Sequence, residues 1–140
     1  MEKGPHQSHH LLERLSREGH EVRVIDTDIL TKKNIKKLFS ERAVYKNAHK
    51  VFDKADITVI RPPYIKIPIV NYLSQVYTHN VEINRQIKEF KPDVIVGFSI
   101  LNSSLAIRLA KKYDIPFVYY IIDELHMLVP QKYFQSIARY

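Results

Sequence analysis

Acidic and histidine side chains directly follow an apolar run near the end of the sequence. Asp123 closes the segment "PFVYYIID", and Glu124 and His126 come just after it. A carboxylate at the end of a buried strand can bind the hydroxyl groups of a ligand or assist a proton transfer. The alternative is that Asp123 caps a helix that follows it. We therefore take Asp123 and His126 as candidate catalytic residues and Glu124 as a candidate binding residue.

Polar side chains also follow two other apolar runs. Arg61 closes "ITVIR", and Ser99 and Asn102 come after "DVIVGF". A guanidinium at the end of a strand can clamp a phosphate, or it can point out to solvent. The hydroxyl of Ser99 and the amide of Asn102 can bind polar groups of a substrate. These three residues are candidates for substrate binding.

Gly4, Pro5 and His6 lead into an expected helix. Free backbone N–H groups and the helix dipole favour an anion such as phosphate at this position, and an ordinary loop is the alternative. His6, His9 and His10 have the i, i+3, i+4 spacing that places side chains on one helical face. A metal site needs further ligands and usually a carboxylate. We therefore expect no metal and interpret these histidines as surface or capping residues.

The elements that must position these residues alternate along the chain. Apolar runs bounded by prolines, glycines and polar residues predict strands, and apolar residues at helical spacing predict helices. The helical pattern is weakest between residues 31 and 54. We expect strands at residues 21–26, 56–63, 93–99 and 116–123, and helices at residues 8–19, 31–54, 69–90, 104–114 and 130–140.

Continuous apolar strands that alternate with helices are typical of a parallel sheet covered on both faces. The fold class that we predict is α/β, a doubly wound parallel sheet of about four strands in a single domain over residues 1–140. In such sheets ligands bind beyond the carboxyl ends of the strands, near the point where the strand order reverses. That rule selects the candidate residues above.

Composition narrows the class of protein. The chain has 140 residues, which suits one domain, and it has no Cys, which excludes disulfides and thiolate metal sites. The formal net charge is +7, and basic residues gather between Thr31 and Lys54. This charge fits a solvated helix face, an anionic membrane surface or, least well, nucleic acid, for which no motif is present. We expect a cytoplasmic protein, with peripheral membrane association as an alternative, and the Lys-, Glu- and Ile-rich composition is suggestive of a thermophile.

Two stretches resemble a known family. "LLERLSREGHEVRVID" and "FKPDVIVGFSILNSSLAIRLAKKYDIPFVYYIIDELHMLVP" are similar to the N-terminal domain of the family 4 glycosyltransferases, in the order and spacing of their motifs. The resemblance implies a Rossmann-like domain of the GT-B type and transfer of a sugar from a nucleotide-sugar donor. In that family the first domain mainly binds the acceptor, which can be a sugar or a lipid-linked acceptor, and a second domain holds the nucleotide.

The resemblance also implies that this sequence covers part of such a domain, without its first strand and without the donor domain. We therefore expect no cofactor and no activity from the chain alone. Two alternatives remain, namely a non-catalytic interaction or membrane-surface module and an unrelated nucleotide-binding domain. Without the first strand, "VRVID" either pairs directly with "DVIVGF" or leaves a gap that another chain fills, which would make the protein a homo-oligomer. We expect a closed or gapped four-stranded sheet of marginal stability.

Overall fold

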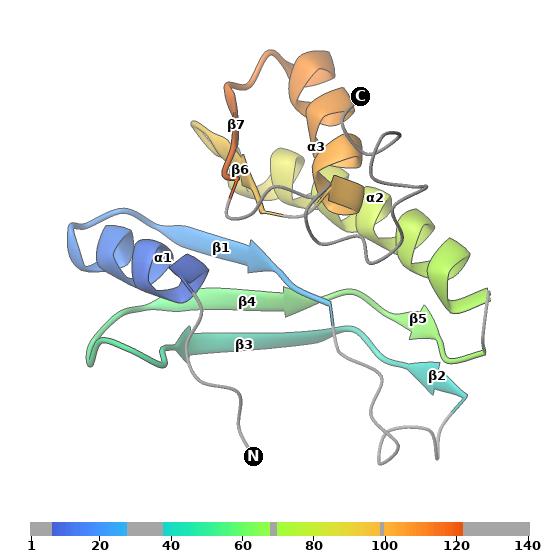
Figure 1. The fold of residues 1–140 in the computed structure, drawn as a ribbon, viewed down its shortest axis with the longest axis horizontal. Coiled ribbons are helices and arrows are strands. Elements are labelled where there is room, and N and C mark those ends of the chain that lie inside the picture. The colour runs from blue at the N-terminus through green and yellow to red at the C-terminus, as the bar shows by residue number, and fades with distance from the viewer. Residues whose placement is uncertain (1–6, 28–37, 68–69, 99, 122–140) are drawn as a thin grey trace, which may run out of the picture. The chain divides into compact units, whose positions relative to one another are not determined.

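The computed structural model describes residues 7–27, 38–67, 70–98 and 100–121 of the chain. It divides into two compact units, Met1–Pro92 and Asp93–Tyr140, which are described separately below. Among the described residues, the first unit combines two helices with a three-stranded and a two-stranded sheet, and the second combines one helix with a two-stranded sheet (Figure 1). This is the predicted α/β class, compatible with a Rossmann-like domain. The expectation of a single domain over residues 1–140 stays a prediction.

The first unit is built on a three-stranded sheet with the order β1-β4-β3. β1 (Val22–Ile25) and β4 (Ile57–Arg61) run parallel, with Val22 opposite Ile57 and Ile25 opposite Ile60. Both strands were expected from their apolar runs. Ile57 and Ile60 are among the most buried residues of the core, at 4% and 2% exposure. The parallel pair brings the carboxyl ends of β1 and β4 to the same edge of the sheet.

The helix expected at residues 31–54 is wrong in the part that the structure describes. Residues 38–54 contain the short strand β2 (Phe39–Ser40) and the longer strand β3 (Ala43–Ala48), while residues 31–37 lie outside the described residues. β3 pairs antiparallel with β4, so the sheet is mixed. Val44 and Tyr45 favour a strand, and the strand bulges between Tyr45 and Ala48, where Asn47 has a φ of 54°. In the sequence, Lys46 of this edge strand and the nearby Lys50 mimic the polar face of a helix.

The long predicted helix is present as α2 (Val70–Phe90). Its buried residues recur at helical spacing and include a histidine, a glutamate and a glutamine. The helix ends where Lys91 adopts a φ of 52° and Pro92 follows, because proline cannot continue the helical hydrogen bonds. Its first turn follows β5 (Tyr64–Ile65), which pairs antiparallel with β2.

α1 (Gln7–Arg17) is tied to the rest of the first unit by a carboxylate. Glu13 is 1% exposed, and its side chain accepts hydrogen bonds from the backbone N–H groups of Lys50, Val51 and Phe52 at 2.7, 2.8 and 2.8 Å. Gly19 ends the helical segment with a φ of 96°, which glycine adopts without steric cost. The expected helix and its glycine stop are both confirmed.

The second unit contains a parallel strand pair joined by a helix. β6 (Ile95–Gly97) and β7 (Phe117–Tyr119) pair in register, and α3 (Ile100–Tyr113) connects them. All three elements were predicted. Gly97 lies so close to α3 that an added Cβ would meet the Oγ atom of Ser103 at 2.2 Å. The direct pairing of "VRVID" with "DVIVGF" stays a prediction.

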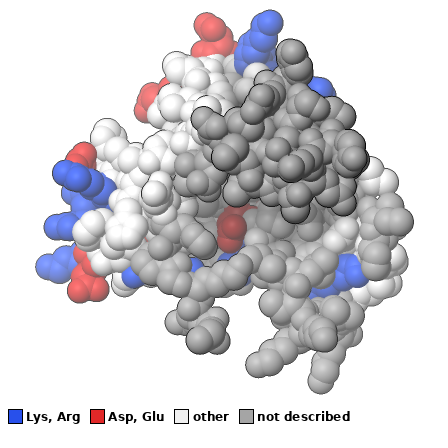
Figure 2. Space-filling view, in the orientation of Figure 1, with Lys and Arg blue, Asp and Glu red and all other residues white. Residues whose placement is uncertain are grey.

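The surface carries charges of both signs. In Figure 2, a group of Lys and Arg side chains on the left edge of the visible face has Asp and Glu side chains above and below it. Within the described parts of the chain, no helix is long and apolar enough to cross a membrane.

Candidate functional site

The carboxyl ends of β1 and β4 bring two oppositely charged side chains together. The backbone N–H of Asp26 donates to the carbonyl of Ile60 at 2.9 Å, which extends the ladder one residue beyond β1. Arg61, the last residue of β4, donates from Nε and Nη2 to the Oδ2 atom of Asp26, both at 3.3 Å. The Arg61 guanidinium also lies 5.3 Å from the centroid of the Tyr45 ring. An ion pair between a guanidinium and a carboxylate therefore lies at the edge where ligands bind in open α/β sheets.

This ion pair is accessible. The side chains of Arg61 and Asp26 are 37% and 45% exposed, and their contact is long for a charge-assisted hydrogen bond. Exposed ion pairs of this kind contribute about 0–1 kcal/mol to stability. A ligand can therefore replace this contact at a small cost in free energy. An anionic group of the ligand would take the place of Asp26 at Arg61, and a hydroxyl group would take the place of Arg61 at Asp26.

A buried histidine supports the same edge from α2. The Nδ1 atom of His79 lies 2.8 Å from the carbonyl oxygen of Gln75, which only accepts, so Nδ1 carries the proton. In the neutral ring, Nε2 then accepts from the hydroxyl of Thr27 at 3.0 Å. Thr27 in turn donates its backbone N–H to the Oδ1 atom of Asp26 at 2.8 Å. His79 thus fixes Thr27, and Thr27 fixes the carboxylate that faces Arg61.

Burial lowers the pKa of His79 below its ordinary value of 6.5, against the opposing effects of the Gln75 carbonyl, Asp26 and Glu82. The neutral form that the hydrogen bonds require is therefore the favoured form at neutral pH.

We expect the chain to lose stability as the pH falls from about 6.5 through the lower folded-state pKa of His79. The unfolded state binds the proton first in this range, so the free energy of unfolding decreases with falling pH. Replacing His79 with glutamine should flatten this part of the profile, whereas replacing the exposed His20 should leave it unchanged. Urea unfolding between pH 7.5 and 5.5 measures both. An unaltered slope in the His79→Gln variant would contradict the assignment.

Of the substrate-binding and catalytic candidates, two lie in the described part of the chain. Arg61 lies at the carboxyl end of β4, where its place in the sequence predicted it, and Asn102 is half-buried in α3 of the second unit. The remaining candidates lie outside the described residues, so their predicted roles stay predictions. These are Gly4, Pro5, His6, Ser99, Asp123, Glu124 and His126.

The histidines of the first helix do not form a metal site in the described structure. His10 packs edge-on against the ring of Phe52, with centroids 6.2 Å apart, while His6 lies outside the described residues. Among the residues that the structure describes, no group of three His, Asp or Glu side chains is arranged to hold a metal ion.

Three residues of this edge were not among the sequence candidates, namely Asp26, Thr27 and His79. Asp26 had a visible signal, because it ends the run "VRVI" as Asp123 ends another apolar run. His79 shares the helical stripe of Ile83 and Ile87, where an inward-facing histidine needs polar partners. Only the fold shows that the partner is Thr27.

A parallel strand pair with polar side chains at its carboxyl edge, accompanied by a β-α-β unit, defines a Rossmann-like α/β protein. The family model of Glycosyltransferase Family 4 matches residues 7–135. The chain belongs to this glycosyltransferase family, as its resemblance predicted. No curated protein and no solved structure matches it.

Proposed function

We propose that this chain is the acceptor-binding side of a glycosyltransferase, which transfers a sugar from a nucleotide-sugar donor when a donor-binding domain completes the site. The match to the family over residues 7–135 carries this proposal. In the reaction, the bond from the sugar's anomeric carbon to the diphosphate breaks, and an acceptor oxygen forms the new bond. The acceptor's proton passes to a base, and the diphosphate leaves.

The carboxyl edge of β1 and β4 has the chemistry that an acceptor needs. Asp26 presents a carboxylate for sugar hydroxyls, and Arg61 presents a guanidinium for a phosphate such as that of a lipid-linked acceptor. Because their mutual contact is weak, a ligand can replace it. We also propose that Asp123 and His126 supply a proton-transferring group in the complete enzyme, and that Gly4, Pro5, His6, Ser99, Asn102 and Glu124 contact substrate.

We expect the purified chain to show no glycosyl transfer with any nucleotide sugar. Positioning of both substrates and stabilisation of the leaving diphosphate supply most of the rate enhancement, and the proposal assigns the diphosphate to another domain. A radiolabelled-sugar transfer assay over a panel of UDP- and GDP-sugars measures this. Activity should appear when a family donor-binding domain is joined to the chain. Turnover by the chain alone, above the rate of donor hydrolysis, would contradict the proposal.

A second candidate, an interaction module at an anionic membrane surface, is favoured by one observation. Apolar side chains on the first half of α2 and on β2 stay exposed, including Leu73 at 64%, Tyr77 at 69% and Phe39 at 59%. Pro63 and Ile65 join Tyr77 and Phe39 around an apolar groove of about 210 Å³. Clustered exposed apolar residues mark binding surfaces more often than isolated ones do.

Sedimentation with vesicles that contain phosphatidylglycerol tests this second candidate. Replacing Leu73 with aspartate should weaken binding about tenfold, because a leucine side chain no longer enters the lipid. Replacing Ile107, an exposed apolar residue of α3, with aspartate provides the matched control. Equal binding by the chain and the Leu73→Asp variant would remove the membrane candidate. The third reading, an unrelated nucleotide-binding domain, is not supported, because the chain belongs to the glycosyltransferase family.

A further inference from the structure

A polar groove of about 390 Å³ lies in the first unit, between α2 and the side chains of β3. Its floor is formed by Thr58 and Ile60 of β4. Glu21 and Asp56, which directly precede β1 and β4, also line it. The groove therefore reaches the amino ends of these parallel strands, whereas Asp26 and Arg61 lie at their carboxyl ends. It is a separate feature from the candidate site above.

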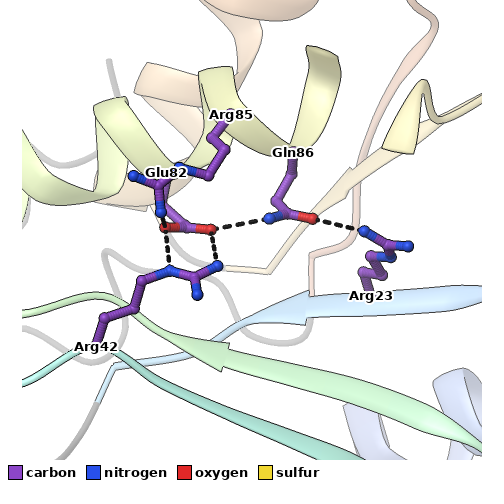
Figure 3. Close-up of polar contacts among 5 residues, drawn as sticks. All are labelled: Arg23, Arg42, Glu82, Arg85 and Gln86. Atoms are coloured by element: carbon purple, nitrogen blue, oxygen red, sulfur yellow. Dashed lines mark hydrogen bonds and ion pairs between the residues drawn. The ribbon is translucent and has the colours of Figure 1, made fainter. Parts of the chain in front are cut away.

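One wall of the groove is held in place by a buried carboxylate. Glu82 of α2 is 2% exposed and accepts two hydrogen bonds from Arg42, both at 2.9 Å. Arg85 donates to the same carboxylate at 3.0 Å. Figure 3 shows Arg42 reaching from the sheet to Glu82 on the helix. The bidentate contact leaves Arg42 little freedom to rotate.

The network continues across the groove to β1. Gln86 donates to Glu82 at 2.9 Å, and its amide oxygen accepts from Arg23 at 3.1 Å. Arg23 also lies over the ring of Phe90, 4.2 Å from its centroid, and donates to Glu21 at 3.1 Å. Arg23, Arg42 and Gln86 are thus held in place before any ligand arrives, which reduces the entropy that these side chains lose on binding.

Other polar groups of the lining have no partner. The side chains of Lys46, Asp56 and Thr58 form no hydrogen bond or ion pair within the described part of the chain. They supply an ammonium donor, a carboxylate acceptor and a hydroxyl that does both. The groove therefore offers donors and acceptors that a bound molecule can satisfy.

The charges of the lining balance. Its cations and carboxylates are equal in number, namely Arg23, Arg42 and Lys46 against Glu21, Asp56 and Glu89. A phosphate would meet the carboxylates, and a cation would meet the guanidiniums, so neither is favoured. A hydroxyl group both donates and accepts, and it fits a lining of mixed polarity.

We propose that this groove binds a neutral polyhydroxylated ligand, and that a saccharide is the chemical class that fits it. Lys46 and Thr58 donate to ligand oxygens, and Asp56 and Glu89 accept from ligand hydroxyls. The proposal stands independently of the proposed function, because it rests on the groove's own side chains and concerns the opposite ends of the strands.

Backbone amide shifts of the ¹⁵N-labelled chain, titrated with maltose, sucrose and methyl glucoside, test the proposal. We expect saturable shifts for Lys46, Thr58 and Glu89 with at least one of these sugars, at millimolar concentrations. Thr58→Val, which keeps the shape and removes the hydroxyl, should weaken binding about fivefold. Lys46→Met should do the same, whereas Lys88→Met, an exposed lysine of α2 outside the groove, should not.

Three results would overturn the proposal. These are the absence of saturable shifts in the groove, tighter binding of inorganic phosphate or glycine than of any saccharide there, and equal saccharide affinity of the Lys46→Met and Lys88→Met variants. Lys46 is exposed, so its replacement decides the question even where Thr58→Val perturbs folding. Shifts confined to Asp26, Thr27 and Arg61 would place saccharide binding at the carboxyl edge alone and would also contradict the groove site.

Discussion

Replacing Glu13 with alanine is expected to lower the free energy of unfolding by about 3 kcal/mol. The carboxylate is the hydrogen-bond acceptor for the backbone N–H groups of Lys50, Val51 and Phe52, and alanine leaves all three without it. The helix α1 then keeps its ring contacts with Phe52, from His10 and Arg17, to the segment that follows β3. Urea unfolding followed by circular dichroism measures the change, and faster amide exchange at residues 50–52 localises it.

Glu18, near the end of the same helical segment, provides the matched control. Its side chain is 56% exposed and bonds Arg14, so its replacement should change stability by less than about 0.5 kcal/mol. Burial raises the pKa of Glu13, but the three backbone donors and His9 outweigh it and leave that pKa below the ordinary value of 4.5. The stabilisation is therefore present above pH 4.5 and is lost as the pH falls through the folded-state pKa. Equal effects of Glu13→Ala and Glu18→Ala would show that the three contacts contribute nothing.

Replacing Gly97 with alanine is expected to destabilise the second unit by about 2 kcal/mol, because the site has no room for a methyl group. The new Cβ would lie 2.2 Å from the Oγ atom of Ser103 and 2.8 Å from the ring of Phe117. Neither neighbour withdraws easily, since Ser103 is 4% exposed within α3 and Phe117 belongs to β7. Loss of amide-exchange protection in β6, β7 and α3 measures the effect.

Two further variants separate steric crowding from a general effect of alanine. Gly19→Ala places a methyl group in open space and costs about 1 kcal/mol through its positive φ alone. Ser103→Ala removes the nearest atom, and its hydroxyl has no hydrogen-bond partner in the described part of the chain, so this change alone should be nearly neutral. In the double variant it should recover more than about 0.5 kcal/mol of the Gly97→Ala loss. Strict additivity of the two changes would contradict the steric explanation.

The sequence predicts α1, α2, α3 and the apolar strands well, because their patterns are local. Leu11, Leu12 and Leu15 lie at helical spacing before Gly19, and Val94, Ile95 and Val96 are apolar on successive residues. β3 could not be predicted in the same way. It is an edge strand with Lys46 and Asn47 on exposed positions, and its antiparallel pairing with β4, which the bulge at Asn47 interrupts, is a long-range contact that the local pattern does not show.

The residues of the candidate site likewise differ in whether a local pattern reveals them. Arg61 was predictable because it directly ends an apolar run, whereas His79 depends on a contact with Thr27 across 52 residues of sequence. Spacing cannot reveal such a contact before the fold is known. The catalytic assignments to Asp123 and His126 stay predictions, since both residues lie outside the described part of the chain.

The proposed function requires that this chain binds the acceptor and that another domain binds the nucleotide. Amide-shift mapping of the labelled chain with UDP-glucose, GDP-mannose and a panel of acceptor glycans tests it most directly. We predict that at least one glycan shifts Asp26, Thr27 and Arg61 saturably, whereas neither nucleotide sugar does so. Saturable binding of a nucleotide sugar at this edge, with no response to any glycan, would contradict the claim.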